Sequence, residues 1–516
     1  MKNNILSRQQ NLFLLILLIL LSTLLFRGRL GSDDLEVFNF IYNFENFNGN
    51  FTEYFEMLRS ENGKRQYYND IQKHSYYTYY HRFIWVVQAY ISFQFVSFFT
   101  SAINLDTLFF HQYFSGWILS FYCTLSMYFF FKICRRSNIS SERSLFLSIV
   151  IFFGTGVISF FTGQFIGSLT LLLFCLRFFL KSQISIFFID FIIILIKPFY
   201  FVIIFFLRVS DYKIFSLPEK KIKELGLCIL ILICYFLLKV LCFDFGQTKN
   251  YAYSQVLVTD FGEYINNLFN LLFSSSAGFI TYSLIPVILL FFGWKKSKTV
   301  LKILSIFFLS LTLSFYDGYH GGVAGNRHLI PVYFIFIPEF ISGYNFLMKK
   351  NKAKKYFLIF FVFITCANLP SIEYRNFAIT EYINGTVILN KPKGPAIKNI
   401  NPKINKKYLM YNYPINSLEF NNVVFANKIF INKLFNKDKI VINDQEINSK
   451  FFYPQTGIGR LIYLGKNNIN TKIKFIDNLN KKYLILQFGY FLIYFVFITF
   501  LVSSLRSELK LANEKN

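Results

Sequence analysis

The chain has 516 residues, of which 54% are hydrophobic and only 16% are charged. Long apolar runs recur from end to end, which excludes an ordinary soluble globular protein and predicts a membrane protein. The formal charge is +26, but many Lys and Arg residues lie in short clusters between apolar runs, where they indicate membrane topology. We therefore expect a lipid bilayer as a partner, and no nucleic acid.

The first predicted element is an apolar helix over Leu12–Phe26, followed by a basic cluster and then by Asp33 and Asp34. A signal peptide is the alternative, but no small-residue cleavage site follows and many further spans do. With the N-terminus in the cytoplasm, the two aspartates lie at the outer water–lipid boundary. A carboxylate there can bind a cation or a sugar, or act as a base. Alternatively, the pair is a solvated loop acid or caps a helix that starts at Leu35.

The polar stretch that follows, about residues 31–82, is expected outside, and it leads into the apolar run Phe83–Ser101. Counting that run as a span would place the basic residues near Arg135 outside, against the positive-inside rule, so we predict a helix on the outer surface. The later spans then alternate: Tyr113–Ile133, Leu145–Phe161, Phe165–Leu180, Ile184–Ile196, Phe199–Leu207, Leu225–Phe243, Ala277–Gly293, Leu301–Phe315, Leu329–Met348, Tyr356–Leu369 and Tyr483–Leu505. This gives about twelve spans with both termini cytoplasmic.

Two features of these spans matter for function. Lys197-Pro198 separates two short apolar runs, and because Pro breaks a helix, we predict a broken pair that meets near the outer side. The charged residues are expected at the ends of the spans. A transporter should instead show paired halves and charged groups buried at the midplane.

The long polar segment 370–482 precedes the last span and is predicted to form a small, mostly β, extracytoplasmic domain. Its expected strands are Val387–Leu389, Asn422–Phe425, Lys439–Ile442, Leu461–Leu464 and Ile473–Ile476. The predicted organisation is thus a transmembrane domain over 1–369 with a first external loop over 27–112, the β-rich domain over 370–482, and a last span with its cytoplasmic tail over 483–516.

Four outward-facing stretches carry candidate chemistry, and they are Ser32–Asp34, Lys73–Arg82, Asn267–Tyr282 and Asp317–Pro331. The fourth contains several glycines, which let a backbone approach a ligand closely. Arg327 and His328 follow at the outer end of a helix, where an Arg suits a phosphate at headgroup level. The alternative is that Arg327 only snorkels to the interface while the glycines form a tight hairpin.

In these motifs and their order the chain resembles the GT-C superfamily of polytopic glycosyltransferases, in the bacterial branch related to protein mannosyltransferases. The matching segments span about the first 350 residues and are Asp33-Asp34, Tyr76–Val86, Lys197-Pro198, Leu271–Ser283 and Gly321–Pro331. The chain departs from the pattern at Asn326, His328 and Leu284, where Pro, an aromatic residue and Pro are usual. The Tyr-rich stretch also lacks the usual Pro-Gly.

The resemblance implies an enzyme of the bacterial cytoplasmic membrane that transfers a sugar, with inversion, from a polyprenyl-phosphate donor to an extracytoplasmic acceptor. Asp33 or Asp34 would be the catalytic base, and Arg327, His328 and Lys197 would bind the donor phosphate. Further substrate-binding candidates are Tyr77, His81, Arg82, Glu263, His320, Gly322 and Gly325. No cofactor is expected, and although a divalent cation could bind the aspartate pair, none is predicted.

Two other classes remain open on this topology. An O-antigen-type polymerase or ligase is also polytopic with a large external loop, but it relies on external Arg and His more than on an Asp pair after the first span. A flippase or transporter for a lipid-linked glycan would carry out no chemistry.

Overall fold

The computed structural model describes Ile19, Ser22 and residues 83–103, 107–162, 165–211, 226–235, 237, 260–274, 278–315, 328–349, 351–372, 421–435, 439–442 and 445–448. This part of the chain is mostly helical. The helices from the first half are α5 (Phe83–Ile103), α6 (Thr107–Arg136), α7 (Ser141–Phe153), η1 (Gly156–Thr162), α8 (Phe165–Phe179), α9 (Gln183–Ile196), η2 (Pro198–Tyr200) and α10 (Phe201–Asp211). Residues Gly226–Tyr235 form a further apolar helix.

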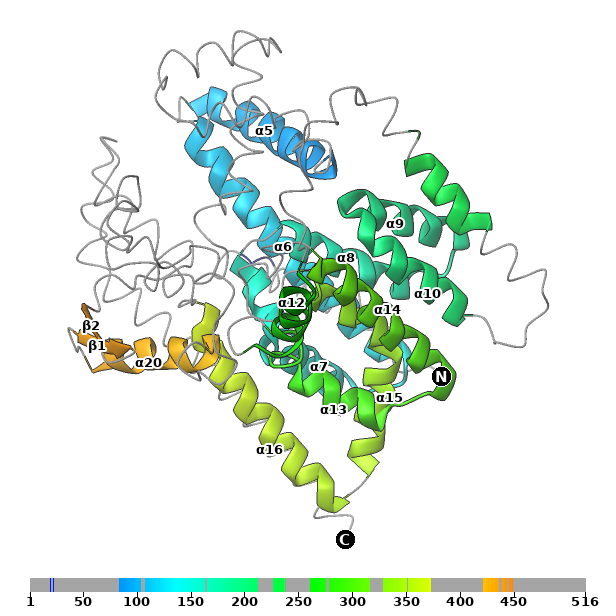
Figure 1. Ribbon diagram of the computed structural model, residues 1–516. Coiled ribbons are helices and arrows are strands. Elements are labelled where there is room, and N and C mark those ends of the chain that lie inside the picture. The colour runs from blue at the N-terminus through cyan, green and yellow to red at the C-terminus, as the bar shows by residue number, and fades with distance from the viewer. Residues whose placement is uncertain are drawn as a thin grey trace.

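The second half supplies α12 (Phe261–Phe273), α13 (Leu284–Phe292), α14 (Lys296–Ser314), η5 (Ile330–Phe336), α15 (Ile337–Lys349), α16 (Asn351–Asn368), η6 (Leu369–Ile372) and α20 (Asn422–Leu434). Strands β1 (Lys439–Ile442) and β2 (Gln445–Asn448) form an antiparallel hairpin. Figure 1 shows α6, α8, α10, α14 and α15 side by side in a central bundle, with α5 and α6 extending to one side and α16, α20 and the hairpin to another.

The bundle has an aromatic centre. Phe130 of α6, Phe152 of α7 and Phe334 of η5 meet edge to face, with ring centroids 5.3–6.0 Å apart. All three side chains are fully buried. Edge-to-face contacts between buried rings are favourable beyond the area they bury, so this cluster ties together segments that are far apart in the sequence.

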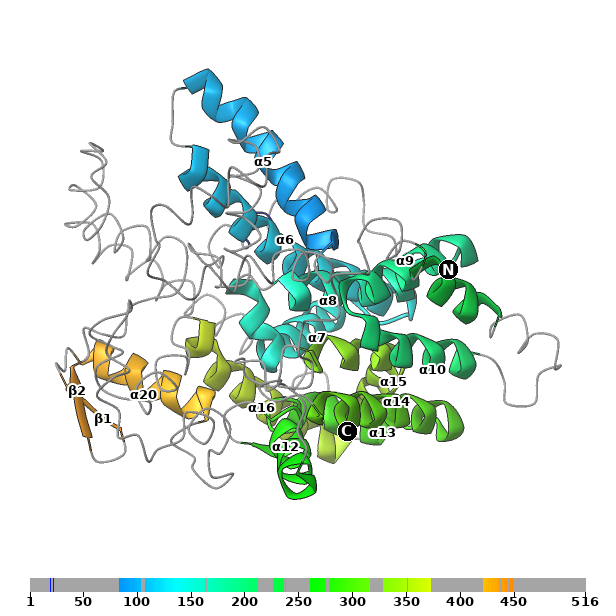
Figure 2. The same cartoon turned by 45° about the horizontal axis from the view of Figure 1, so that its top comes forward.

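Two glycines let α13 and α15 pack closely. A Cβ at Gly343 would lie only 2.0 Å from the Leu289 carbonyl oxygen, and one at Gly293 only 1.9 Å from that of Glu339. No larger residue fits there unless the backbones separate. Figure 2 shows α13 and α15 close to each other at the lower edge of the bundle.

Each predicted span between Tyr113 and Leu369 contains a helix among its described residues, which confirms the helical class of this region, whereas the number of spans stays a prediction. Two segments of the described residues, Gly116–Arg136 and Ile330–Lys349, are long and apolar enough to cross a membrane. The predicted surface helix exists as α5, and its position relative to a membrane stays a prediction. Of the first span only Ile19 and Ser22 are described, and the last span, Tyr483–Leu505, lies outside the described residues.

One predicted strand of the 370–482 segment is confirmed and one is wrong. Lys439–Ile442 is β1, as expected. Asn422–Phe425 instead begins α20, because the Asn421 side chain accepts hydrogen bonds from the backbone N–H groups of Val423 and Val424 and so caps the helix. Asn427 of α20 donates to the Ala367 carbonyl, which docks this helix on the end of α16. The other expected strands lie outside the described residues.

Candidate functional site

The helix break at Lys197-Pro198 is present as predicted. Helix α9 ends at Ile196, and Lys197 is extended, with φ −151° and ψ 114°. Pro198 then starts the short helix η2, and α10 follows directly. Pro lacks an N–H group and disfavours the helical conformation of the residue before it, which explains why the chain changes direction here.

This break contacts the segment that follows the glycine-rich stretch. The Tyr200 hydroxyl donates a hydrogen bond of 2.9 Å to the backbone carbonyl of His328. The Phe199 ring meets the His328 ring edge to face, with centroids 5.8 Å apart and planes at 87°. The Lys197 Nζ atom lies 5.6 Å from the centroid of the same Phe199 ring. Lys197 and His328, both predicted to bind the donor phosphate, are therefore brought together around one aromatic side chain.

The third predicted stretch, Asn267–Tyr282, contacts helix η5. The ring of Phe279 lies 5.5 Å from that of Tyr333 in η5, centroid to centroid. Tyr333 donates a 2.9 Å hydrogen bond to the Thr155 hydroxyl, and the Gly156 N–H donates to the Tyr282 carbonyl at 3.1 Å. Thr155 and Gly156, at the start of η1, thus join residues 278–283 to η5. The convergence of Asn267–Tyr282 with Asp317–Pro331 stays a prediction, because residues 317–327 lie outside the described residues.

Helix α12 contacts the C-terminal end of α14. The Tyr264 ring lies 4.4 Å from that of Phe315, and its hydroxyl donates to the Leu311 carbonyl at 3.4 Å. Glu263 lies in α12, but its side chain is outside the described part of the structure.

The other predicted site residues fall outside the described residues, and their placement stays a prediction: Asp33, Asp34, Tyr77, His81, Arg82, His320, Gly322, Gly325 and Arg327. Arg327 directly precedes His328 in the chain. Among the residues that are described, no group of three or more His, Cys, Asp or Glu side chains is placed to hold a metal ion.

A second polar region was not expected. Asp190, near the middle of α9, is fully buried between two arginines. Its Oδ1 lies 2.8 Å from Arg177 Nε of α8, and its Oδ2 lies 2.7 Å from Arg208 Nη2 of α10. One carboxylate therefore links three helices, and the triad carries a net charge of +1.

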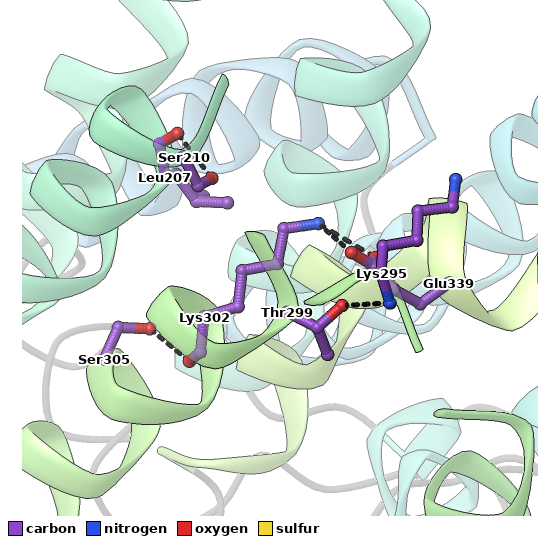
Figure 3. A network of polar contacts seen from close by, with 7 residues as sticks. All are labelled: Leu207, Ser210, Lys295, Thr299, Lys302, Ser305 and Glu339. Carbon is purple, nitrogen blue, oxygen red and sulfur yellow. Dashed lines mark hydrogen bonds and ion pairs between the residues drawn. The ribbon is translucent and has the colours of Figure 1, made fainter. Parts of the chain in front are cut away.

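Lys302 of α14 and Glu339 of α15 form another buried ion pair, with Lys302 Nζ at 2.9 and 2.8 Å from the two carboxylate oxygens. Figure 3 shows the Lys302 side chain extending from its helix toward Glu339. The Phe178 ring joins this pair to the triad, because it lies 5.9 Å from Lys302 Nζ and 5.8 Å from the Arg177 guanidinium carbon. The expectation that charges occupy only the ends of the spans is thus wrong for Asp190 and Glu339.

The sequence itself shows that Asp190 and Glu339 lie within apolar runs. Asp190 interrupts the apolar run Ile184–Ile196, and Glu339 lies within Leu329–Met348. An isolated acid inside a predicted span needs a cationic partner, so the positions of these two acids indicate buried ion pairs. By contrast, no spacing rule could have found the hydrogen bond from Tyr200 to His328, because it joins residues 128 positions apart in the sequence.

Comparisons of the chain with protein-family models, with curated proteins and with solved structures give no match.

Proposed function

We propose that the chain is a polytopic membrane glycosyltransferase that transfers a sugar from a polyprenyl-phosphate donor to an extracytoplasmic acceptor. In this proposal about twelve spans cross the bacterial cytoplasmic membrane, both termini are cytoplasmic, and a mostly β domain precedes the last span. The acceptor is a glycan, a lipid or a protein on the outer face.

The observation that carries the proposal is the contact between the Lys197-Pro198 break and His328. Two segments that are far apart in the sequence, each selected as a candidate for phosphate binding, meet around Phe199. Tyr200 fixes the backbone of His328 by its hydrogen bond, so the start of the η5 segment is held against the break. Arg327 is covalently next to His328 and would bring a second cation to the same place.

The proposed reaction needs a base and a cationic site. Asp33 or Asp34 would remove the proton from an acceptor hydroxyl while its oxygen attacks the anomeric carbon of the sugar. The bond from that carbon to the phosphate oxygen breaks, and its electron pair leaves with the polyprenyl phosphate. Lys197, Arg327 and, when protonated, His328 would stabilise the charge that develops on the leaving phosphate. Attack opposite the leaving group inverts the anomeric centre.

The experiment measures sugar transfer from polyprenyl-phosphate sugars in membranes that contain the wild type, Lys197→Met, or Asp33→Asn with Asp34→Asn. Both variants should lose transfer at normal protein levels, but only Lys197→Met should weaken donor binding. Lys181→Met is the matched control, because Lys181 is exposed just before the other end of α9. Unchanged transfer in the double aspartate variant would contradict the proposed base.

A flippase for a lipid-linked glycan is the second candidate, and the buried charges favour it. Charged groups in the interior of a membrane protein commonly mark a substrate or ion pathway, and Asp190 and Glu339 lie within predicted spans. Export of an intact lipid-linked glycan, without transfer from any lipid-phosphate donor, would support this candidate over the enzyme. An O-antigen-type polymerase or ligase remains an alternative enzyme, and joining of intact lipid-linked glycans would identify it.

A further inference from the structure

Helix α12 exposes a stripe of apolar side chains and buries several polar ones, the reverse of a surface helix in a water-soluble protein. Phe261, Ile265, Phe269 and Phe273 follow one another at intervals of four residues and are exposed, Phe261 to 76%. The opposite face holds Asn267, Asn270 and Ser274, all of them buried. An exposed apolar stripe of this kind fits hydrocarbon rather than water, so the polar face is turned away from lipid and into the protein.

The rotation of α12 about its axis is fixed by the turn that follows it. The N–H groups of Phe279 and Ile280 donate to the carbonyls of Leu271 and Leu272 at 2.9 and 2.8 Å. Gly278 makes this return possible, because a Cβ there would lie 2.5 Å from the backbone N and O of Ser274. At the other end, Tyr264 contacts α14. The helix therefore cannot rotate Asn267 and Asn270 outward without breaking these contacts.

On this buried face, the Nδ2 atom of Asn267 makes no hydrogen bond to the described residues. The residue is only 4% exposed. One turn further along the helix, Asn270 donates from its Nδ2 to Asn266 Oδ1 at 3.3 Å. This hydrogen bond orients the Asn270 amide. A buried amide that makes no hydrogen bond destabilises a fold, and native proteins seldom leave one without a protein, water or ligand partner.

We propose that Asn267 binds the sugar of the lipid-linked donor, with its Nδ2 donating to a sugar hydroxyl oxygen. This inference rests on the proposed glycosyltransferase function and assigns a sugar subsite to it. A neutral amide matches a hydroxyl, which accepts a hydrogen bond and carries no charge, whereas the donor phosphate is better matched by Lys197 and its neighbours. The attachment of residues 278–283 to η5, which follows His328 and Leu329, ties the α12 turn to the proposed phosphate site.

The test measures binding of polyprenyl-phosphate glucose, mannose and N-acetylglucosamine, and of sugar-free polyprenyl phosphate, to the full-length protein in lipid nanodiscs. We expect the wild type to bind at least one sugar-bearing lipid more tightly than the sugar-free lipid. Asn267→Ala should weaken the binding of that lipid about fivefold to tenfold, the effect of one lost hydrogen bond. Binding of the sugar-free lipid should not change. Asn345→Ala, at an exposed asparagine of α15, is the matched control and should change neither.

A second variant tests the unpartnered amide without any ligand. Asn267→Leu keeps the size of the side chain and removes its polar atoms, so the ligand-free protein should unfold at the same or a higher temperature while sugar-dependent binding is lost. A clearly lower unfolding temperature would mean that a water or the protein already satisfies the amide, which would overturn the proposal.

The binding results distinguish a failure of the sugar subsite from a failure of the proposed function. If the wild type binds sugar-bearing and sugar-free lipids equally, the sugar subsite is overturned and the phosphate site survives. If it binds none of these lipids, the proposed function fails and the subsite fails with it. A sugar preference that survives in Asn267→Ala overturns the subsite alone.

Discussion

Buried ion pairs join α8, α9 and α10, and another joins α14 and α15. By contrast, Lys197 and His328, near the helix break, contact the Phe199 ring. In the first region each carboxylate lies within 2.9 Å of a cationic nitrogen. Such pairs hold helices in register, and breaking one leaves a buried charge that nothing compensates. In the second region the two candidate groups contact one aromatic ring, with Lys197 Nζ 5.6 Å and the His328 ring 5.8 Å from the centroid of Phe199. The comparison predicts large effects on stability in the first region and effects on binding in the second.

The largest effect is expected from Asp190→Ala. Removing this carboxylate leaves Arg177 and Arg208 facing each other in the protein interior, and we expect a loss of about 3–5 kcal/mol in unfolding free energy. Unfolding of the purified protein in detergent, followed by circular dichroism, measures it. The control is Glu142→Ala in the exposed first turn of α7, which should cost less than about 1 kcal/mol. Equal effects of the two substitutions would remove the distinction between the regions.

A double-mutant cycle on Lys302 and Glu339 sharpens the same point. Glu339→Met alone leaves the Lys302 ammonium buried and should cost about 3 kcal/mol or more. Lys302→Met together with Glu339→Met replaces both charges by apolar side chains of similar length, so the double variant should be more stable than Glu339→Met alone. The same unfolding assay measures all the variants. A double variant less stable than the single one would mean that the pair contributes more than mutual charge compensation.

The helical class and the break at Lys197-Pro198 could be predicted from the sequence. These features depend on local rules, because a long apolar run sets a helix and Pro ends one. The failures have equally physical reasons. Residues Asn422–Phe425 look like a strand by their β-branched residues, yet the Asn421 cap and the contact between Asn427 and α16 make them helical.

The buried polar side chains were harder to predict. Asp190 could have been recognised as a buried acid in need of a partner, but its choice of Arg177 and Arg208 depends on how three helices pack. The inverted faces of α12 are visible in the sequence as a four-residue repeat of Phe and Ile opposite asparagines. Which face is buried follows only from the turn at Gly278, where two backbone hydrogen bonds fold the chain back on the helix.

The smallest effect is expected from Tyr200→Phe, in the region around Phe199. The substitution removes only the hydroxyl that donates to the His328 carbonyl, a buried hydrogen bond of 2.9 Å, so the loss in unfolding free energy should be about 1 kcal/mol. Donor binding should weaken more than this small loss suggests, because the hydrogen bond holds the backbone of His328 against the break that carries Lys197. Tyr344→Phe is the matched control, since Tyr344 is equally buried but lies in α15, where it takes no part in the contact between the break and His328. If both variants lose stability to a similar degree and neither loses donor binding, the Tyr200 contact serves packing alone, and the charged and aromatic regions do not differ in the way proposed.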